Sequence, residues 1–100
     1  MNITSANNLV HNEYVSGAGY GEIIKNIPVD ISVACIPGTE SSAKVQYTLD
    51  STLDENNWKD WPKGTVAEYA EDVLVANVYA LRLAVLFGES TIRLVGKRYV

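Results

Sequence analysis

The chain has 100 residues, of which 47% are hydrophobic and 20% are charged, and its formal net charge is −4 at pH 7. This length allows about one domain, and the composition is typical of a globular protein, which excludes a wholly disordered chain. The charge is unevenly placed: residues 1–77 carry a net of −7, while residues 78–100 carry a net of +3. Because binding to a phosphate backbone needs many cations on one face, this acidic chain is not expected to bind nucleic acid.

Reactive side chains are few. Cys35 is the only cysteine, which excludes an intramolecular disulfide and a cysteine-rich metal site, and its apolar setting, VACIP, favours a buried, inert thiol. His11, the only histidine, lies in an Asn-rich stretch that does not favour a general base. There is no leader and no apolar run of about 18 residues, so no membrane association is predicted. We therefore expect no enzymatic activity, no catalytic residues, no cofactor and no metal.

In chain order, residues 1–19 are rich in Asn, Ser and Gly, and they are predicted to form an N-terminal arm or a short strand before a single β-sandwich domain over residues 20–100. Residues 20–27 are a weak strand candidate. Residues 29–36 alternate apolar and polar positions, as do residues 44–49, so each predicts a half-buried strand, with Val45, Tyr47 and Leu49 on one face of the second. A loop of about seven residues joins these strands, which predicts that they are antiparallel neighbours.

Residues 50–64, DSTLDENNWKDWPKG, are the most polar stretch and predict a loop. Its acidic residues suggest a calcium loop, but the Asp-x-Asp-x-Asp-Gly spacing and the bidentate Glu are missing, so no metal site is predicted and ion binding by residues 50–60 stays open. Trp58 and Trp61 are candidate residues for stacking a sugar ring if they are exposed. The favoured alternative is that one of them closes the end of the core.

Residues 65–75, TVAEYAEDVLV, allow two interpretations. Apolar residues at helical spacing and acidic residues opposite them indicate an amphipathic helix. The turn residues before this segment and the β pattern after it favour a short strand near residues 65–66 and an extended crossing to residue 75. We favour the extended form.

Residues 78–95, VYALRLAVLFGESTIRLV, predict a β-hairpin. With Gly88 and Glu89 in a two-residue type II′ turn, Val85 would pair with Ile92, Leu83 with Leu94 and Arg82 with Val95. One face then carries Leu81, Leu83, Val85, Ile92 and Leu94, and the other carries Ala80, Arg82, Ala84, Arg93 and Lys97. The second face is the basic surface of an acidic protein, so Arg82, Arg93 and Lys97 form a candidate interface for an acidic neighbour, such as another copy of the chain.

Together these segments predict an all-β protein: a small antiparallel β-sandwich of six to eight short strands that closes with a C-terminal hairpin.

The segments VQYTLD, WKDWPKGTV, VYALRL and STIRLVGK together resemble a small β-sandwich structural protein of tailed-bacteriophage virions, over residues 44–97. The resemblance is a pattern of strands and turns, and it does not extend to residues 1–43. It implies a non-enzymatic part of the particle, of the capsid-decoration, head-fibre or neck or tail type. Such a part would form homo-oligomers, bind a capsid, neck or tail protein, and be assembled in the host cytoplasm.

A second hypothesis is a carbohydrate- or host-receptor-binding β-sandwich module that uses Trp58 or Trp61 with polar groups of the loop. Exposed indoles that respond to glycans would favour it over the virion hypothesis.

Overall fold

The computed structural model describes residues 6–28, 30–74 and 77–99, with only the backbone considered for residues 6–8 and 97–99. These residues form nine strands, three of them only two residues long, and one 3₁₀ turn, η1 (Glu55–Asn57). The strands are β1 (Ala6–Ser16), β2 (Gly19–Tyr20), β3 (Ile24–Lys25), β4 (Ile31–Pro37), β5 (Ser42–Thr48), β6 (Lys59–Asp60), β7 (Ala70–Leu74), β8 (Ala80–Phe87) and β9 (Glu89–Tyr99). The all-β prediction is confirmed, although it expected fewer strands.

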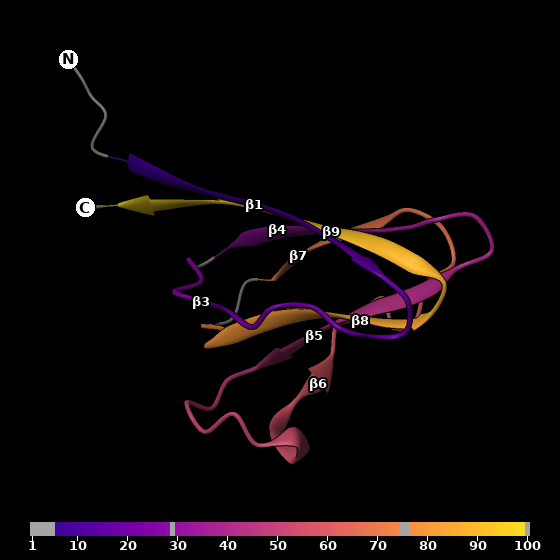
Figure 1. The fold of residues 1–100 in the computed structure, drawn as a ribbon. Helices are drawn as coiled ribbons and strands as arrows, with labels where there is room; N and C mark the ends of the chain where they lie inside the picture. The colour runs from indigo at the N-terminus through magenta and orange to yellow at the C-terminus, as the bar shows by residue number, and fades with distance from the viewer. Residues whose placement is uncertain (1–5, 29, 75–76, 100) are drawn as a thin grey trace.

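Two antiparallel sheets pack face to face, as the two layers of Figure 1 show. Sheet A has the order β1-β9-β4-β7. Sheet B has the order β2-β8-β5-β6, and β3 also pairs with β8. The chain between β5 and β6, which contains η1, lies below sheet B in Figure 1. The start of β1 and the end of β9 lie side by side, with Ala6 opposite Tyr99.

The core lies between the two sheets. Each sheet turns its alternate apolar side chains inward, and every residue predicted for the apolar face of the final hairpin is 7% exposed or less. Burying one such side chain fully contributes about 1.5–3 kcal/mol, so this interior is the main source of stability. The buried cluster comprises Ile24, Ile31, Val33, Cys35, Ala43, Val45, Trp61, Leu74, Val78, Leu81, Leu83, Val85, Ile92 and Leu94.

The predicted C-terminal hairpin is wrong. β8 pairs with β2, β3 and β5, whereas β9 pairs with β1 and β4, so the chain changes sheet at Gly88. Val85 and Ile92 therefore enter the core from opposite sheets instead of pairing in one sheet. The same residues face inward in both arrangements, because side chains alternate along a strand in either case. With the two strands in opposite sheets, however, their apolar faces cover each other.

Gly88 adopts a left-handed backbone, as the predicted turn required, with φ +80°. A Cβ atom at this position would overlap the Ser41 hydroxyl, which accepts a hydrogen bond from the Glu89 backbone N–H at 3.0 Å. The Gly88 carbonyl accepts a hydrogen bond from the Gly17 N–H at 2.7 Å. Hydrogen bonds from the loop before β5 and from the turn after β1 therefore both stabilise the backbone at Gly88 and Glu89, where the chain passes from one sheet to the other.

The predicted pairing of residues 29–36 with residues 44–49 is also wrong, because β4 lies in sheet A and β5 in sheet B. The alternation in β4 is confirmed, since Ile31, Val33 and Cys35 are buried and Ser32 is exposed; Val29 lies outside the described residues. Leu49, predicted to face inward, is 61% exposed because β5 ends one residue earlier.

Residues 65–74 contain no helix, as favoured; bends on either side of Val66 lead into the strand β7. Val66 forms an isolated bridge with Ala43 of β5, and β7 then pairs with β4 at the edge of sheet A. Residues 75 and 76 lie outside the described residues. At the other edge, β1 is an eleven-residue strand paired with β9 along its length, longer than the short strand predicted.

Candidate binding surfaces

Arg82 lies on the outward side of β8 and is only 4% exposed, because other segments enclose it. Its Nε donates to Oε1 of Gln46, the residue opposite it on β5, at 2.9 Å. Its two terminal nitrogens donate to the two carboxylate oxygens of Glu55 at 3.0 Å each. Its guanidinium carbon lies 3.7 Å from the centre of the Tyr20 ring and 4.2 Å from that of Trp58. We call these five residues the arginine clamp.

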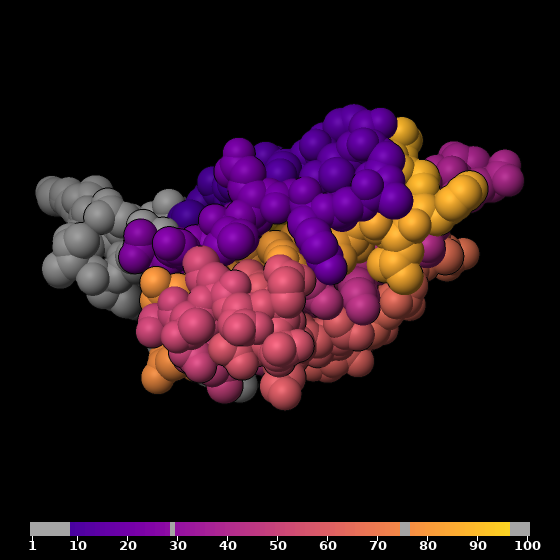
Figure 2. Space-filling view, turned by 60° about the horizontal axis from the view of Figure 1, so that its bottom comes forward, coloured from indigo at the N-terminus to yellow at the C-terminus, as the bar shows by residue number. Residues whose placement is uncertain are grey.

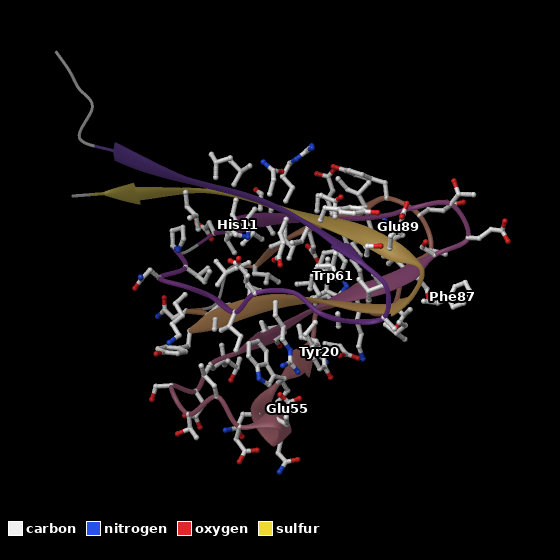
Figure 3. All side chains as sticks on the ribbon, in the orientation of Figure 1. His11, Tyr20, Glu55, Trp61, Phe87 and Glu89 are labelled. Atoms are coloured by element: carbon white, nitrogen blue, oxygen red, sulfur yellow. The ribbon has the colours of Figure 1, made fainter. Side chains whose placement is uncertain are left out.

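The arginine clamp fastens the chain between β5 and β6 to the outer face of sheet B. In Figure 3, Tyr20 and Glu55 lie together beneath that sheet, and Figure 2 shows residues 50–65 covering this side of the molecule beside residues 17–27. Asp60 adds a second attachment, since it accepts hydrogen bonds from Gln46 at 3.1 Å and from Lys44 at 3.2 Å. The middle of the outer face of sheet B, around Arg82, is therefore covered by the chain itself, whereas Leu86 near the end of β8 stays half exposed.

These attachments lower the pKa values of two carboxyl groups, Glu55 and Asp60. The hydrogen bonds from Arg82 lower the pKa of Glu55, because they favour its ionised form. The hydrogen bonds from Gln46 and then Lys44 lower the pKa of Asp60 in the same way. Both side chains therefore hold the loop most firmly when they are charged.

The clamp overturns one predicted role of Arg82. An exposed interface residue was expected, but its guanidinium is enclosed and paired within the chain. The sequence held one signal of this, because Ala80 and Ala84, its neighbours on the same face, are small and leave room for covering groups.

Trp58 and Trp61 are both buried, so they form no exposed platform for a sugar ring. Trp61 points into the core, as Figure 3 shows, and its indole Nε1 donates to the Gly64 carbonyl at 2.6 Å. Trp58 points the other way, against Arg82. In an extended chain, residues three apart lie on opposite faces, which explains why the two indoles separate across β6.

Arg93 lies on the outer face of sheet A, so the two arginines predicted to share one basic surface occupy opposite sides of the sandwich. Arg93 is exposed, and its Nε donates to Oδ1 of Asn12 on β1 at 2.9 Å. Lys97 belongs to β9 opposite Asn8, but its side chain lies outside the described part of the chain. The expected cluster of Arg82 with Arg93 is therefore wrong.

The outer face of sheet A, which we call the open face, carries large apolar side chains around Arg93. Register places Val10, Val95, Ser32 and Val73 in one row across the sheet, and Asn12, Arg93, Ala34 and Glu71 in the next. Beside Arg93 is a shallow hollow of about 150 Å³. Five side chains on this face are between 46% and 60% exposed: Val10, Tyr14, Tyr69, Val73 and Val95.

Two tyrosine hydroxyls on the open face are held by carboxylates. Tyr14 Oη donates to Glu89 Oε1 at 2.6 Å, and Tyr69 Oη donates to Glu71 Oε1 at 2.9 Å. Each hydrogen bond raises the pKa of its tyrosine, because the carboxylate stabilises the protonated phenol. Sequence reasoning missed this face, although the alternation of Val10, Asn12 and Tyr14 was visible in residues 1–19.

A cleft of about 620 Å³ lies on the other side of the molecule, where the chain leaves β5. Residues from the end of β5, the polar loop, the start of β6 and the approach to β8 form it. Its lining contains two tyrosines, several amide and hydroxyl groups, one acid and one base: Tyr47, Thr48, Leu49, Asp50, Ser51, Asn56, Asn57, Lys59 and Tyr79.

The buried thiol has no histidine beside it in sheet A. Cys35 is 0% exposed, as predicted, and burial raises its pKa. Its Sγ lies 3.6 Å from Ser90 Oγ. His11 lies on β1, which β9 separates from β4, and its Nε2 is 3.7 Å from Glu13 Oε1. This arrangement does not activate the thiol as a nucleophile.

No protein-family model, curated protein or solved structure matches this chain. In the part of the chain that the structure describes, no group of three or more His, Cys, Asp and Glu side chains is placed to hold a metal ion. The same residues include no helix long and apolar enough to cross a membrane.

Proposed function

We propose that this chain is a non-enzymatic structural component of a tailed-phage virion, of the capsid-decoration, head-fibre or neck or tail type, and that it assembles through the open face of sheet A. The virion part of the proposal rests on the pattern of strands and turns in residues 44–97. The assembly part rests on one observation: five large apolar side chains lie half exposed together on the outer face of sheet A. On sheet B, the middle of the outer face is covered by the chain itself, and the exposed Tyr20, Leu86 and Phe87 lie around that cover. Clustered apolar exposure of this kind marks interaction sites.

The occupant we propose for the open face is a second copy of the chain. Arg93 and Glu71 lie in one row on either side of Ala34. A two-fold axis between the copies and along β4 would place Arg93 of each copy opposite Glu71 of the other. The same axis would bring Val95 opposite Val73. The face is therefore complementary to itself in both charge and apolar contact, which a symmetric dimer requires.

The magnitudes predict a weak dimer. Burying a half-exposed residue of this size contributes about 1 kcal/mol, so the five residues of each copy together contribute about 10 kcal/mol. Association costs about 4–15 kcal/mol in lost translational and rotational freedom. We therefore expect a dimer that dissociates on dilution, and on a particle the high local concentration of copies would favour it.

Sedimentation equilibrium from about 1 to about 500 µM tests the dimer, with an expected shift from monomer to dimer across that range. Val73→Asp should keep the protein monomeric, because it places a charge in the apolar row. Leu49→Asp is the matched control, since Leu49 is also a large exposed apolar residue, at 61% against 49% for Val73, but lies on the other side of the molecule. A wild-type protein that stays monomeric throughout, or a dimer that survives Val73→Asp, would contradict the proposed interface.

A charge exchange tests the symmetry. Arg93→Glu and Glu71→Arg should each weaken the dimer, because each places like charges opposite one another, and the double variant should restore it. Failure of the double variant to recover would exclude the axis along β4. The virion assignment has a separate test, which is mass spectrometry of purified particles of the phage whose genome encodes the chain. Absence of the protein from those particles would contradict that assignment.

A further inference from the structure

The cleft beside the polar loop is of the size of a small-molecule site. Its volume of about 620 Å³ falls within the range of about 300–1,000 Å³ typical of ligand pockets. It lies on the side of sheet B, away from the open face of sheet A, so a ligand there would not compete with the proposed dimer.

Two tyrosines form the rigid aromatic part of the cleft. Tyr47 belongs to β5 and packs partly against the core cluster, which leaves its ring half buried. Tyr79 immediately precedes β8 and is half buried as well, and its backbone N–H donates to the Thr48 carbonyl at 2.8 Å. The backbone of both tyrosines is therefore held by hydrogen bonds. Each ring is only partly buried, so part of it can contact the apolar face of a ligand ring.

The cleft contains polar groups that have no partner inside the described part of the chain. The side-chain amide of Asn56, the hydroxyl of Ser51 and the two tyrosine hydroxyls make no hydrogen bond there. An amide both donates and accepts, and so does a hydroxyl, so these groups match ligand hydroxyls, which do the same. Asp50 and Lys59 bring one negative and one positive charge, which balance.

The loop is also ordered by its own hydrogen bonds. Asp50 Oδ1 accepts from the Thr52 N–H at 2.9 Å, and Asp54 Oδ1 accepts from the Asn56 N–H at 2.9 Å. Asn57 donates to the Thr52 carbonyl at 3.3 Å. The arginine clamp holds Glu55, which is adjacent to Asn56. Because these contacts exist without a ligand, little ordering would be needed on binding.

We propose that this cleft binds a neutral oligosaccharide, with a sugar ring against Tyr47 and Tyr79 and its hydroxyl groups on Asn56, Asn57 and Asp50. A pyranose ring combines an apolar C–H face, which packs against aromatic rings, with hydroxyls that donate and accept, and the cleft offers both kinds of surface. The balanced charge of the lining favours a neutral sugar over an acidic one. The buried tryptophans take no part, apart from Trp58 holding the loop through Arg82.

Backbone and side-chain amide NMR tests this site on the intact chain. Maltotriose, cellotriose and triacetylchitotriose are added separately to about 10 mM, which detects dissociation constants in the millimolar range. At least one sugar should give saturable shifts confined to residues 47–59 and 79. Asn56→Ala should weaken that response about fivefold, the loss of one hydrogen bond, and Tyr79→Ala should abolish it. Tyr69→Ala, which removes an exposed tyrosine from the open face, should leave the response unchanged.

Three results would overturn the proposal. They are no saturable shift with any of the three sugars, an affinity that Asn56→Ala leaves unchanged, and a stronger response to the acidic sugar 3′-sialyllactose than to all three neutral ones. If Tyr79→Ala disturbs the fold, as its own spectrum would show, Asn56→Ala decides the matter, because Asn56 is exposed and its side chain makes no contact that the fold needs. Loss of the dimer would leave these outcomes unaffected.

Discussion

Replacement of Arg82 by alanine is the most informative test of how the loop is held. The side chain is 4% exposed and contacts two aromatic rings. A cation–π contact is worth about 0.5–1 kcal/mol against an exposed ring such as Tyr20 and about 2 kcal/mol against a buried one such as Trp58. The hydrogen bond to Gln46 adds about 1 kcal/mol. The ion pair with Glu55 adds to this loss, but it is left out of the sum because the carboxylate is exposed. Arg82→Ala should therefore lower the free energy of unfolding by about 3–4 kcal/mol.

Urea denaturation followed by tryptophan emission measures this loss, because both indoles are buried in the folded protein. With an m-value of about 1–3 kcal/mol/M for a chain of this size, the midpoint should fall by at least about 1 M. Arg93→Ala is the matched control, since Arg93 is exposed and its side chain donates one hydrogen bond, to Asn12; its effect should stay within about 0.5 kcal/mol. If the two variants lost the same stability, the arginine clamp would not be a stabilising structure.

Three further predictions test the fold and its charges. Leu83→Asp should prevent folding, because it places an unpaired carboxylate where the side chain is 0% exposed, and circular dichroism that still showed a cooperative β-sheet transition would contradict the core. Gly88→Val should destabilise the protein by more than Gly17→Val does in urea denaturation; both positions have positive φ, but only at Gly88 would the Cβ overlap another residue, and equal effects would contradict the proposed role of Ser41. The pKa of Glu55 lies below its ordinary value of 4.5, so its contribution is present above that pH and is lost as pH falls through the lowered pKa. Glu55→Gln should therefore reduce the acid sensitivity of the urea midpoint below about pH 4.5, and an unchanged pH profile would show that this ion pair does not stabilise the fold.

The inward-facing residues could be predicted from sequence, but not the sheet to which each strand belongs. Alternation places Val85 and Ile92 inside whether their strands pair as a hairpin or face each other from opposite layers, because the side-chain period is the same. Gly88 suits either geometry, since both use a positive φ. What decides between them is the cost of leaving one apolar face uncovered, which is a property of the whole chain and not of the local pattern.

The candidate surfaces were harder to predict because they depend on contacts between distant residues. Arg82 and Glu55 are separated by 27 positions, and nothing in either local sequence links them. The outward positions of β5 were correctly assigned as polar, but alternation does not tell whether an outer face meets solvent or the protein's own loop. Lys44 and Gln46 are outward and yet bind Asp60 of β6. The same limit hid the open face, where Tyr14 lies on β1 and Tyr69 immediately precedes β7, at opposite edges of sheet A.

The two outer faces therefore differ in how the chain covers them. By holding Glu55 and Trp58 against β8, Arg82 covers the middle of the outer side of sheet B and at the same time positions Asn56 and Asn57 at the wall of the cleft. In the described part of the chain, no segment covers Val73 and Val95 in this way, and these are the side chains that the proposed dimer would bury. In a dimer formed through that face, the two clefts would point away from each other, and one particle could present many of them. Weak binding at each cleft would then be amplified by the number of copies rather than by the strength of any single site.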